Sequence, residues 1–204
     1  MPTIDQDELV AFVDSVRRLL ADRSTEADVR RAMESPEGYD PALWSELASM
    51  GVCGLLVDPR HGGVGAGPVE LERVMEVMGA VLACTPMLSS GVLAAGLLQA
   101  LDDADAQARL LPGIADGSCI ATVALTGPKG GWTEDDLAVT AQPADGSWRL
   151  DGTAGYVTHG QLADLLLVVA RTPDGIGVFE LPADTRGVQG TALPGFDRTP
   201  PLAN

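Results

Sequence analysis

The side chains that most often carry catalysis are few in this sequence, and none lies in a recognisable catalytic arrangement. The two histidines, His61 and His159, each stand beside a glycine in an expected loop, where a histidine is more often a surface residue than a catalytic one. The serines at positions 89 and 90 lie in a Leu-Ser-Ser-Gly sequence, which is not the G-x-S-x-G pattern of a nucleophilic serine. The acidic residues 134–136 follow two glycines and predict a solvated turn. The residues alone therefore indicate no catalytic residue and no metal site.

A glycine-rich segment, residues 62–67, precedes an expected helix and invites comparison with a phosphate-binding loop. Its glycines do not have the one, three, six spacing of a dinucleotide-binding loop, and no strand–helix–strand unit is expected around it. It also lacks the Gly-Lys-Ser/Thr ending of a P-loop. We predict that this segment is a structural loop.

The acidic composition excludes several classes of partner. The 204 residues include 13 Lys and Arg and 29 Asp and Glu, which gives a formal net charge of −16. Such a chain is repelled by nucleic acids and by anionic membranes. The longest apolar run, residues 162–170, is interrupted by Asp164 and is too short to cross a bilayer. The three separated cysteines, Cys53, Cys84 and Cys119, indicate reduced thiols, so we expect a cytoplasmic protein without membrane insertion.

The first part of the chain, residues 1–117, has the periodicity of a helical domain. Apolar residues recur at helical spacing along it. Asp40 and Pro41 provide an N-cap and a first-turn proline, and Gly51 predicts the end of the same helix. The expected helices cover roughly residues 5–21, a second from residue 24 or 25, 41–50, one from residue 68, 87–101 and 103–114. The helix at 87–101 is nearly all apolar, so we expect it to be buried on most sides.

The second part, residues 118–204, has the pattern of short strands joined by tight turns. Asp145-Gly146 and Asp151-Gly152 are hairpin signals. No helix is expected between the strands, so we predict a small antiparallel sheet or barrel, and an α+β fold class for the chain. The last residues, Pro200 to Asn204, show no terminating element. The expected strands are residues 120–125, 137–141, 148–150, 153–158, 165–170 and 176–181.

The order of several motifs resembles that of the acyl-CoA dehydrogenase family. The first part contains, in sequence, an apolar helix ending in glycine, an apolar run, Gly-Gly-x-Gly and an acidic helix. In the second part, residues 124–128 are similar to the family's A-L-T-E-P strand end, and residues 151–160 to its N-G-x-K-x-[WF]-I-T-N-G. The stretches that carry the resemblance are residues 47–57, 62–65, 70–79, 110–117, 124–128, 151–169, 193–194 and 197–199.

The resemblance implies a fold and a cofactor. An N-terminal α-helical bundle domain, residues 1–117, would be followed by a middle β domain, residues 118–204, with the family's C-terminal four-helix domain absent. The implied cofactor is FAD, whose flat ring needs an apolar packing surface with N–H and hydroxyl groups at its edge. By position in the family motifs, Trp132 would contact the substrate, and the cofactor-binding residues would be Val123, Leu125, Thr126, Gly131, Tyr156, Val157 and Thr158.

The sequence departs from the family pattern at several of these positions. Gly127 stands where the family has glutamate, and Gly-Trp-Thr at residues 131–133 replaces Gly-Ser-Asp. A tryptophan cannot donate the short hydroxyl hydrogen bond of that serine, which normally contacts cofactor phosphate. Ala154 or Gly155 stands for a lysine and His159 for an asparagine. The family's catalytic base is a carboxylate of the C-terminal domain, so no residue here is assigned that role.

The resemblance implies α,β-dehydrogenation of an acyl-CoA thioester with hydride transfer to FAD, an oxidoreductase reaction of fatty acid or lipid metabolism. An electron-transfer partner protein would reoxidise the flavin, and a homo- or hetero-oligomer is expected because exposed apolar faces must be covered. A second hypothesis is a non-catalytic scaffold subunit of a heteromeric bacterial acyl-CoA dehydrogenase, which the substitutions at residues 127 and 132 favour. A third is other flavin chemistry on the same fold, of the oxygenase or nitroalkane oxidase type.

Overall fold

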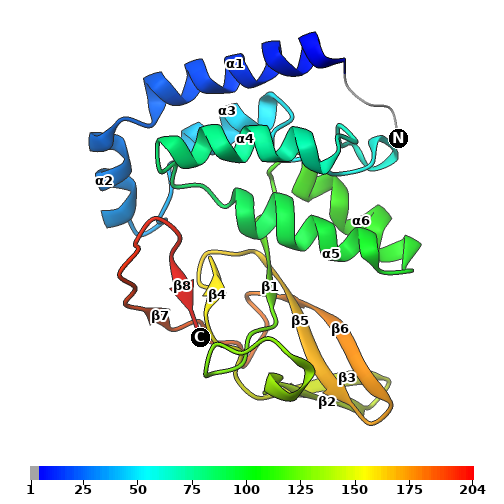
Figure 1. Ribbon diagram of the computed structural model, residues 1–204. Coiled ribbons are helices and arrows are strands. Elements are labelled where there is room, and N and C mark those ends of the chain that lie inside the picture. Colours follow the sequence, from blue (N-terminus) through cyan, green and yellow to red (C-terminus); the bar gives the residue numbers. More distant parts are fainter. Residues whose placement is uncertain (1–4) are drawn as a thin grey trace. The chain divides into compact units, whose positions relative to one another are not determined.

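The computed structural model describes residues 5–204, which divide into two compact units (Figure 1). The first unit ends at Cys119, and the second is Ile120–Asn204. This division falls two residues after the boundary expected at residue 117. The first unit is helical, and the second consists of strands with one short 3-10 helix. The α+β fold class is therefore confirmed.

The helices of the first unit begin at residues that satisfy their free backbone N–H groups. Thr25 and Asp28 form a reciprocal capping box, and Asp40 accepts two N–H groups of a helix that opens with Pro41. Among residues 5–204, no helix is both long and apolar enough to cross a membrane. The elements are α1 (Gln6–Arg23), α2 (Glu26–Glu34), α3 (Pro41–Ser49), the 3-10 turn η1 (Pro59–His61), α4 (Pro68–Ala80), the π-helix η2 (Met87–Ala94), α5 (Ala95–Ala100) and α6 (Ala104–Ala115).

The core of the first unit is formed by the apolar stripes of α1, α3 and α4. Leu20 of α1, Leu47 of α3 and Val74 of α4 are fully buried in one cluster. Each such side chain contributes roughly 1.5–3 kcal/mol when it leaves water. Trp44 packs in the same cluster, and its indole N–H donates to the Gly117 carbonyl at 3.0 Å. This hydrogen bond attaches the end of the unit to α3.

The apolar segment 87–101 is not the single, mostly buried helix that its composition predicts. It starts as the π-helix η2 and continues as α5, and Leu88 and Leu93 are 42% and 43% exposed. The buried side of η2 carries Met87 together with small residues, including Ser89 and Gly91. A Cβ at Gly91 would lie 2.9 Å from the Cys53 carbonyl, so close backbone packing explains why small residues face inward.

The glycine-rich segment 62–67 packs against the backbone of the residues that precede it. A Cβ at Gly63 would overlap the Val57 carbonyl, and Gly65 has a φ of 70° with Pro59 against it. The Gly65 N–H donates to the same Val57 carbonyl at 2.8 Å. These contacts support the predicted structural loop, because backbone packing within the unit accounts for its glycines.

The second unit contains two sheets. The larger has strand order β1-β5-β2-β3 with β6 also paired to β5, and the smaller has order β4-β8-β7. Asp145 and Gly146 have φ values of 47° and 78°, as a two-residue hairpin requires, which confirms the predicted turn between β2 and β3. The strands are β1 (Ala121–Ala124), β2 (Thr140–Ala144), β3 (Ser147–Asp151), β4 (Val157–Thr158), β5 (Leu165–Thr172), β6 (Gly175–Pro182), β7 (Ala192–Leu193) and β8 (Leu202–Ala203), with the 3-10 helix η3 (Glu134–Asp136) after β1.

Three details of the β prediction are corrected. Both β1 and β2 pair with β5 in parallel, so the larger sheet is mixed, and the described strands form no closed barrel. Long connections permit such pairing, which local turn signals cannot indicate. Of the strand expected at 153–158, only Val157 and Thr158 form a ladder, because Tyr156 has a φ of 56°. The final residues do contain a strand, β8, which pairs with β4 and β7.

The glycine loop yields a stability prediction. Gly63→Ala should lower the free energy of unfolding of the first unit by roughly 2–4 kcal/mol, because the new methyl group overlaps backbone. Gly79→Ala, which adds a methyl group into open space in α4, should instead stabilise by about 0.5–1 kcal/mol. Urea unfolding followed by the helical circular dichroism signal measures both. Equal effects of the two substitutions would contradict this account of the loop.

Candidate functional site

The predicted cofactor-binding residues all lie in the second unit, at the end of β1 and around β4. Val123 is in β1, and Leu125 and Thr126 follow it directly. Two hydrogen bonds bring this region to β4: the Thr122 hydroxyl donates to the Thr158 carbonyl at 2.6 Å, and the Gly155 N–H donates to the Thr126 carbonyl at 2.8 Å. The structure therefore places the end of β1 directly beside β4.

The exposure of these residues differs along the two segments. Val157 is buried, Thr126 and Thr158 are half-buried, and Tyr156 is 48% exposed. An exposed aromatic ring beside half-buried hydroxyl groups provides an apolar face with hydrogen-bonding groups close to it. That combination suits a flat ring with a polar edge.

The loop that follows Thr126 turns back on itself. The Gly127 N–H donates to the Gly131 carbonyl at 2.7 Å, and a Cβ at Gly130 would lie 3.6 Å from the Tyr156 ring. The loop therefore passes beside Tyr156. Trp132, the predicted substrate contact, is 77% exposed, and the aromatic ring pair present in residues 5–204 joins two other residues, Trp148 and Phe179.

Asp136 fixes the far end of this loop. Its carboxylate accepts the Thr133 hydroxyl at 2.6 Å and the Thr133 N–H at 3.1 Å. These hydrogen bonds hold the pKa of Asp136 below its usual value. A Cβ at Gly131 would overlap this carboxylate, and one at Gly127 would overlap the Asp136 carbonyl. This loop conformation therefore requires glycine at residue 127, whereas a side chain at residue 131 would have to displace the Asp136 carboxylate.

His159 was expected on the surface and is instead 1% exposed. It follows β4 with a φ of 56°, its N–H donates to the Pro201 carbonyl at 2.7 Å, and its carbonyl accepts the N–H groups of Leu162 and Ala163. The adjacent glycine suggested a loop but gave no sign of burial. Desolvation in this position lowers the pKa of His159 to about 4, so the ring is neutral at pH 7. His61, in the first unit, is half-buried.

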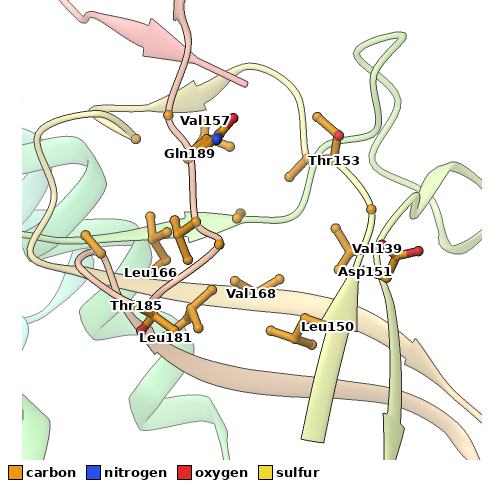
Figure 2. Close-up of a pocket in the computed structure, with 18 of the residues that line it drawn as sticks. Val139, Leu150, Asp151, Thr153, Val157, Leu166, Val168, Leu181, Thr185 and Gln189 are labelled. Atoms are coloured by element: carbon orange, nitrogen blue, oxygen red, sulfur yellow. The ribbon is translucent and has the colours of Figure 1, made fainter.

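A cavity of about 760 Å³ also lies within the second unit, and sequence reasoning did not anticipate it (Figure 2). Its apolar lining includes Leu166 and Val168 of β5 and Leu181 of β6. Of the predicted site residues, Val157 alone lines it. The continuous apolar run of β5 could have suggested a strand that is covered on both faces, because every residue from Leu165 to Ala170 is buried. The segments that enclose the cavity are far apart in sequence and carry no shared signal.

The described residues give no indication of a metal site or of a reactive thiol. Residues 5–204 contain no group of three His, Cys, Asp or Glu side chains placed to hold a metal ion. Of the cysteines of this region, Cys53 and Cys84 are buried and Cys119 is half-buried. Burial raises the pKa of the Cys53 thiol to about 12, which keeps it protonated and unreactive at pH 7.

The buried histidine predicts a pH dependence. The unfolded chain binds a proton at His159 below a pKa of 6.5, whereas the folded chain binds it only near 4. Stability is therefore lost as the pH falls from 6.5 to 4, by up to about 3 kcal/mol. His159→Asn should remove this part of the slope, since asparagine tolerates the positive φ and does not titrate. Urea unfolding between pH 7 and pH 4 tests this, with His61→Asn as the control. Identical slopes in the wild type and His159→Asn would contradict it.

Comparison with known proteins assigns the fold to a family. The family model for the acyl-CoA dehydrogenase N-terminal domain matches residues 6–118. The chain is 36% identical over 155 residues to the acyl-CoA dehydrogenase FadE27 of Mycobacterium tuberculosis, an alignment that covers 76% of this chain and 40% of FadE27.

Two solved structures show the same fold across both units. The Tcur3481-Tcur3483 steroid ACAD matches with a TM-score of 0.85 and 32% identity, over 97% of this chain and 54% of that chain. A chain of the ChsE4-ChsE5 complex from Mycobacterium tuberculosis matches with a TM-score of 0.81 and 31% identity, over 91% of this chain and 50% of that chain. The chain thus spans about half the length of these relatives. Because the family model covers more than half of its residues, the chain belongs to the acyl-CoA dehydrogenase family.

Proposed function

We propose that this chain contributes the flavin-binding wall of an enzyme that dehydrogenates an acyl-CoA thioester between its α and β carbons. The observation that carries the proposal is the attachment of the end of β1 to β4 by the Gly155–Thr126 and Thr122–Thr158 hydrogen bonds. FAD, when bound, supplies the acceptor for the hydride that leaves the β carbon. Family membership supports this assignment.

The residues at this wall fit a flavin ring. Tyr156 offers an exposed aromatic face, and Val123, Leu125 and Val157 are the apolar residues of the two adjoining segments. Thr126 and Thr158 are the groups that we expect to donate to the polar edge of the ring, and the half-buried Gly131 lies in the loop that follows Thr126. The wall binds and orients the cofactor, and we propose no proton transfer for its residues.

The remaining parts of the reaction lie outside this chain in our proposal. A carboxylate base, an electron-transfer partner protein and further subunits would be needed for turnover. Similarity to the steroid ACAD supports a CoA thioester with a bulky polycyclic acyl group as the substrate class. Trp132, with its large exposed ring, is the residue that we expect to contact that substrate.

A second candidate function is that of a scaffold subunit that keeps the fold without the cofactor. The packing of the loop favours it, because Asp136 occupies the space that side chains at residues 127 and 131 would need. A glutamate at residue 127, as in the family pattern, could not be accommodated without a change of the loop. Existence of the ChsE4-ChsE5 complex shows that proteins of this fold pair with a second kind of chain.

Flavin binding separates the two functions. Titration of the purified protein with FAD, followed by quenching of flavin fluorescence, should show binding that Tyr156→Asn weakens by about tenfold, because the stacking surface is lost. Asparagine accepts the positive φ of this position, so the fold is retained. Tyr156→Phe should bind as the wild type does. Trp148→Ala, which removes a half-exposed aromatic ring of β3, is the matched control and should have no effect. Absence of FAD binding by the folded wild type would overturn the flavin proposal and favour the scaffold.

A further inference from the structure

The chain runs from the end of β1 into the short helix η3, and an arginine of the larger sheet holds that helix. Arg171 lies near the end of β5, directly after the fully buried Ala170, and is half-buried. The Nε–H of its guanidinium donates to the Leu137 carbonyl at 3.2 Å, and a terminal nitrogen donates to the Glu134 carbonyl. Its backbone N–H donates to the Val139 carbonyl at 3.0 Å. One residue of β5 therefore binds three carbonyl groups along η3 and the segment after it.

The shape of the arginine side chain suits these acceptors. Carbonyl groups at the end of a helix have unused acceptor positions. A guanidinium group is planar, stays charged and holds its N–H groups at fixed angles, so it can bond two carbonyls at once. Leu137 is itself buried, at 7% exposed, so an apolar contact and the Arg171 hydrogen bonds both attach the end of η3 to the second unit.

The helix η3 in turn packs against the wall loop, which comprises residues 127–133. A Cβ at Gly127 would lie 2.2 Å from the Asp136 carbonyl oxygen, and one at Gly131 would lie 2.2 Å from the carboxyl carbon of Asp136. The Asp136 carboxylate also accepts the hydroxyl and the N–H of Thr133. The backbone of the loop is thus in direct contact with η3, so a displacement of η3 must move the loop.

The wall loop transmits this contact to the Tyr156 ring. The Gly127 N–H donates to the Gly131 carbonyl at 2.7 Å, and the Gly130 N–H donates to the Gly127 carbonyl at 2.9 Å. A Cβ at Gly130 would lie 3.6 Å from the Tyr156 ring. The residue that touches η3 is therefore bonded to the residue that lies beside the ring.

We propose that Arg171 is a positioning residue of the flavin site, which acts through η3 on the conformation of the wall loop. We assign it no contact with the cofactor. The effect on flavin rests on the proposed function, whereas the effect on the loop does not. A binding surface that is ordered before the ligand arrives costs less entropy to bind. Loss of the guanidinium group should therefore weaken flavin binding although no group at the cofactor is removed.

The first measurement follows the wall loop in the protein without flavin. Arg171→Met removes both guanidinium donors and keeps a long side chain, so hydrogen exchange of the buried Gly127 amide should become about tenfold faster. The Ala183 amide, which donates to the Asp164 carbonyl at 3.0 Å elsewhere in the second unit, should keep its rate. This difference separates positioning of the loop from a general loss of stability. Arg149→Met, at an exposed arginine of β3, is the matched control and should change neither rate.

Arg171→Lys is the conservative variant. Its ammonium group keeps the positive charge but lacks the planar fork, so exchange at Gly127 should rise by about threefold, between the wild type and Arg171→Met. If Arg171→Met does not fold, Arg171→Lys decides alone by the same comparison. Equal exchange at Gly127 in the wild type and the folded Arg171 variants, or an equal rise at Gly127 and Ala183, would overturn the proposal.

The second measurement titrates the same proteins with FAD and follows flavin fluorescence. Arg171→Met should bind FAD about tenfold more weakly than the wild type and Arg171→Lys about threefold, while Arg149→Met should bind equally. Equal affinity of the wild type and the Arg171 variants would overturn the positioning role. Absence of FAD binding by the wild type would overturn the proposed function instead, and exchange at Gly127 would still decide whether Arg171 positions the loop.

Discussion

The second unit depends on two residues held in the left-handed backbone region, Tyr156 and His159, which bound the two-residue strand β4. Residues with a Cβ rarely adopt this conformation, and it persists only where surrounding contacts hold it. Here the Gly155 N–H is bonded to Thr126 before β4, and the His159 N–H to Pro201 after it. These turns limit β4 to two residues, which pair with Leu202 and Ala203 of β8. The Tyr156 ring beside it is exposed, and the His159 ring is buried. The proposed wall and the lining of the cavity both follow from this local constraint.

The first unit could be predicted well because its signals are local. A capping residue such as Thr25 or Asp40 acts on N–H groups two or three residues away, so it can be recognised without knowledge of the tertiary structure. The predictions failed where packing between segments that are far apart in the sequence determines the structure. Gly91 faces the Cys53 carbonyl, and this contact places small residues on the buried side of η2 and leaves Leu88 and Leu93 exposed. Nothing in the apolar composition of residues 87–101 reveals it.

In the second unit, too, local features were predicted correctly and features that depend on distant segments were not. The Asp145-Gly146 hairpin was predicted because two residues determine its backbone, whereas the parallel pairing of β1 with β5 joins strands more than forty positions apart. The wall residues were named only because motif positions resemble a family pattern, and that pattern gives no burial. It could not indicate that His159 is enclosed or that Asp136 fills the space beside Gly131. Burial of a polar ring depends on the segments that cover it, here including the backbone of Pro201.

The wall and the cavity are physically connected through β4, whose Val157 lines the cavity. One edge of β4 is tied to β1 by the Thr122–Thr158 hydrogen bond, and the other edge pairs with β8. The ladder between β4 and β8 therefore supports the segment next to Tyr156 before any cofactor arrives. Ordering a binding surface in advance lowers the entropic cost of binding to it. Because such coupling is reciprocal, a flavin at the wall would in turn stabilise the pairing of β4 with β8. Folding of the smaller sheet and loading of the cofactor would then be one linked equilibrium, with β4 as the element that connects them.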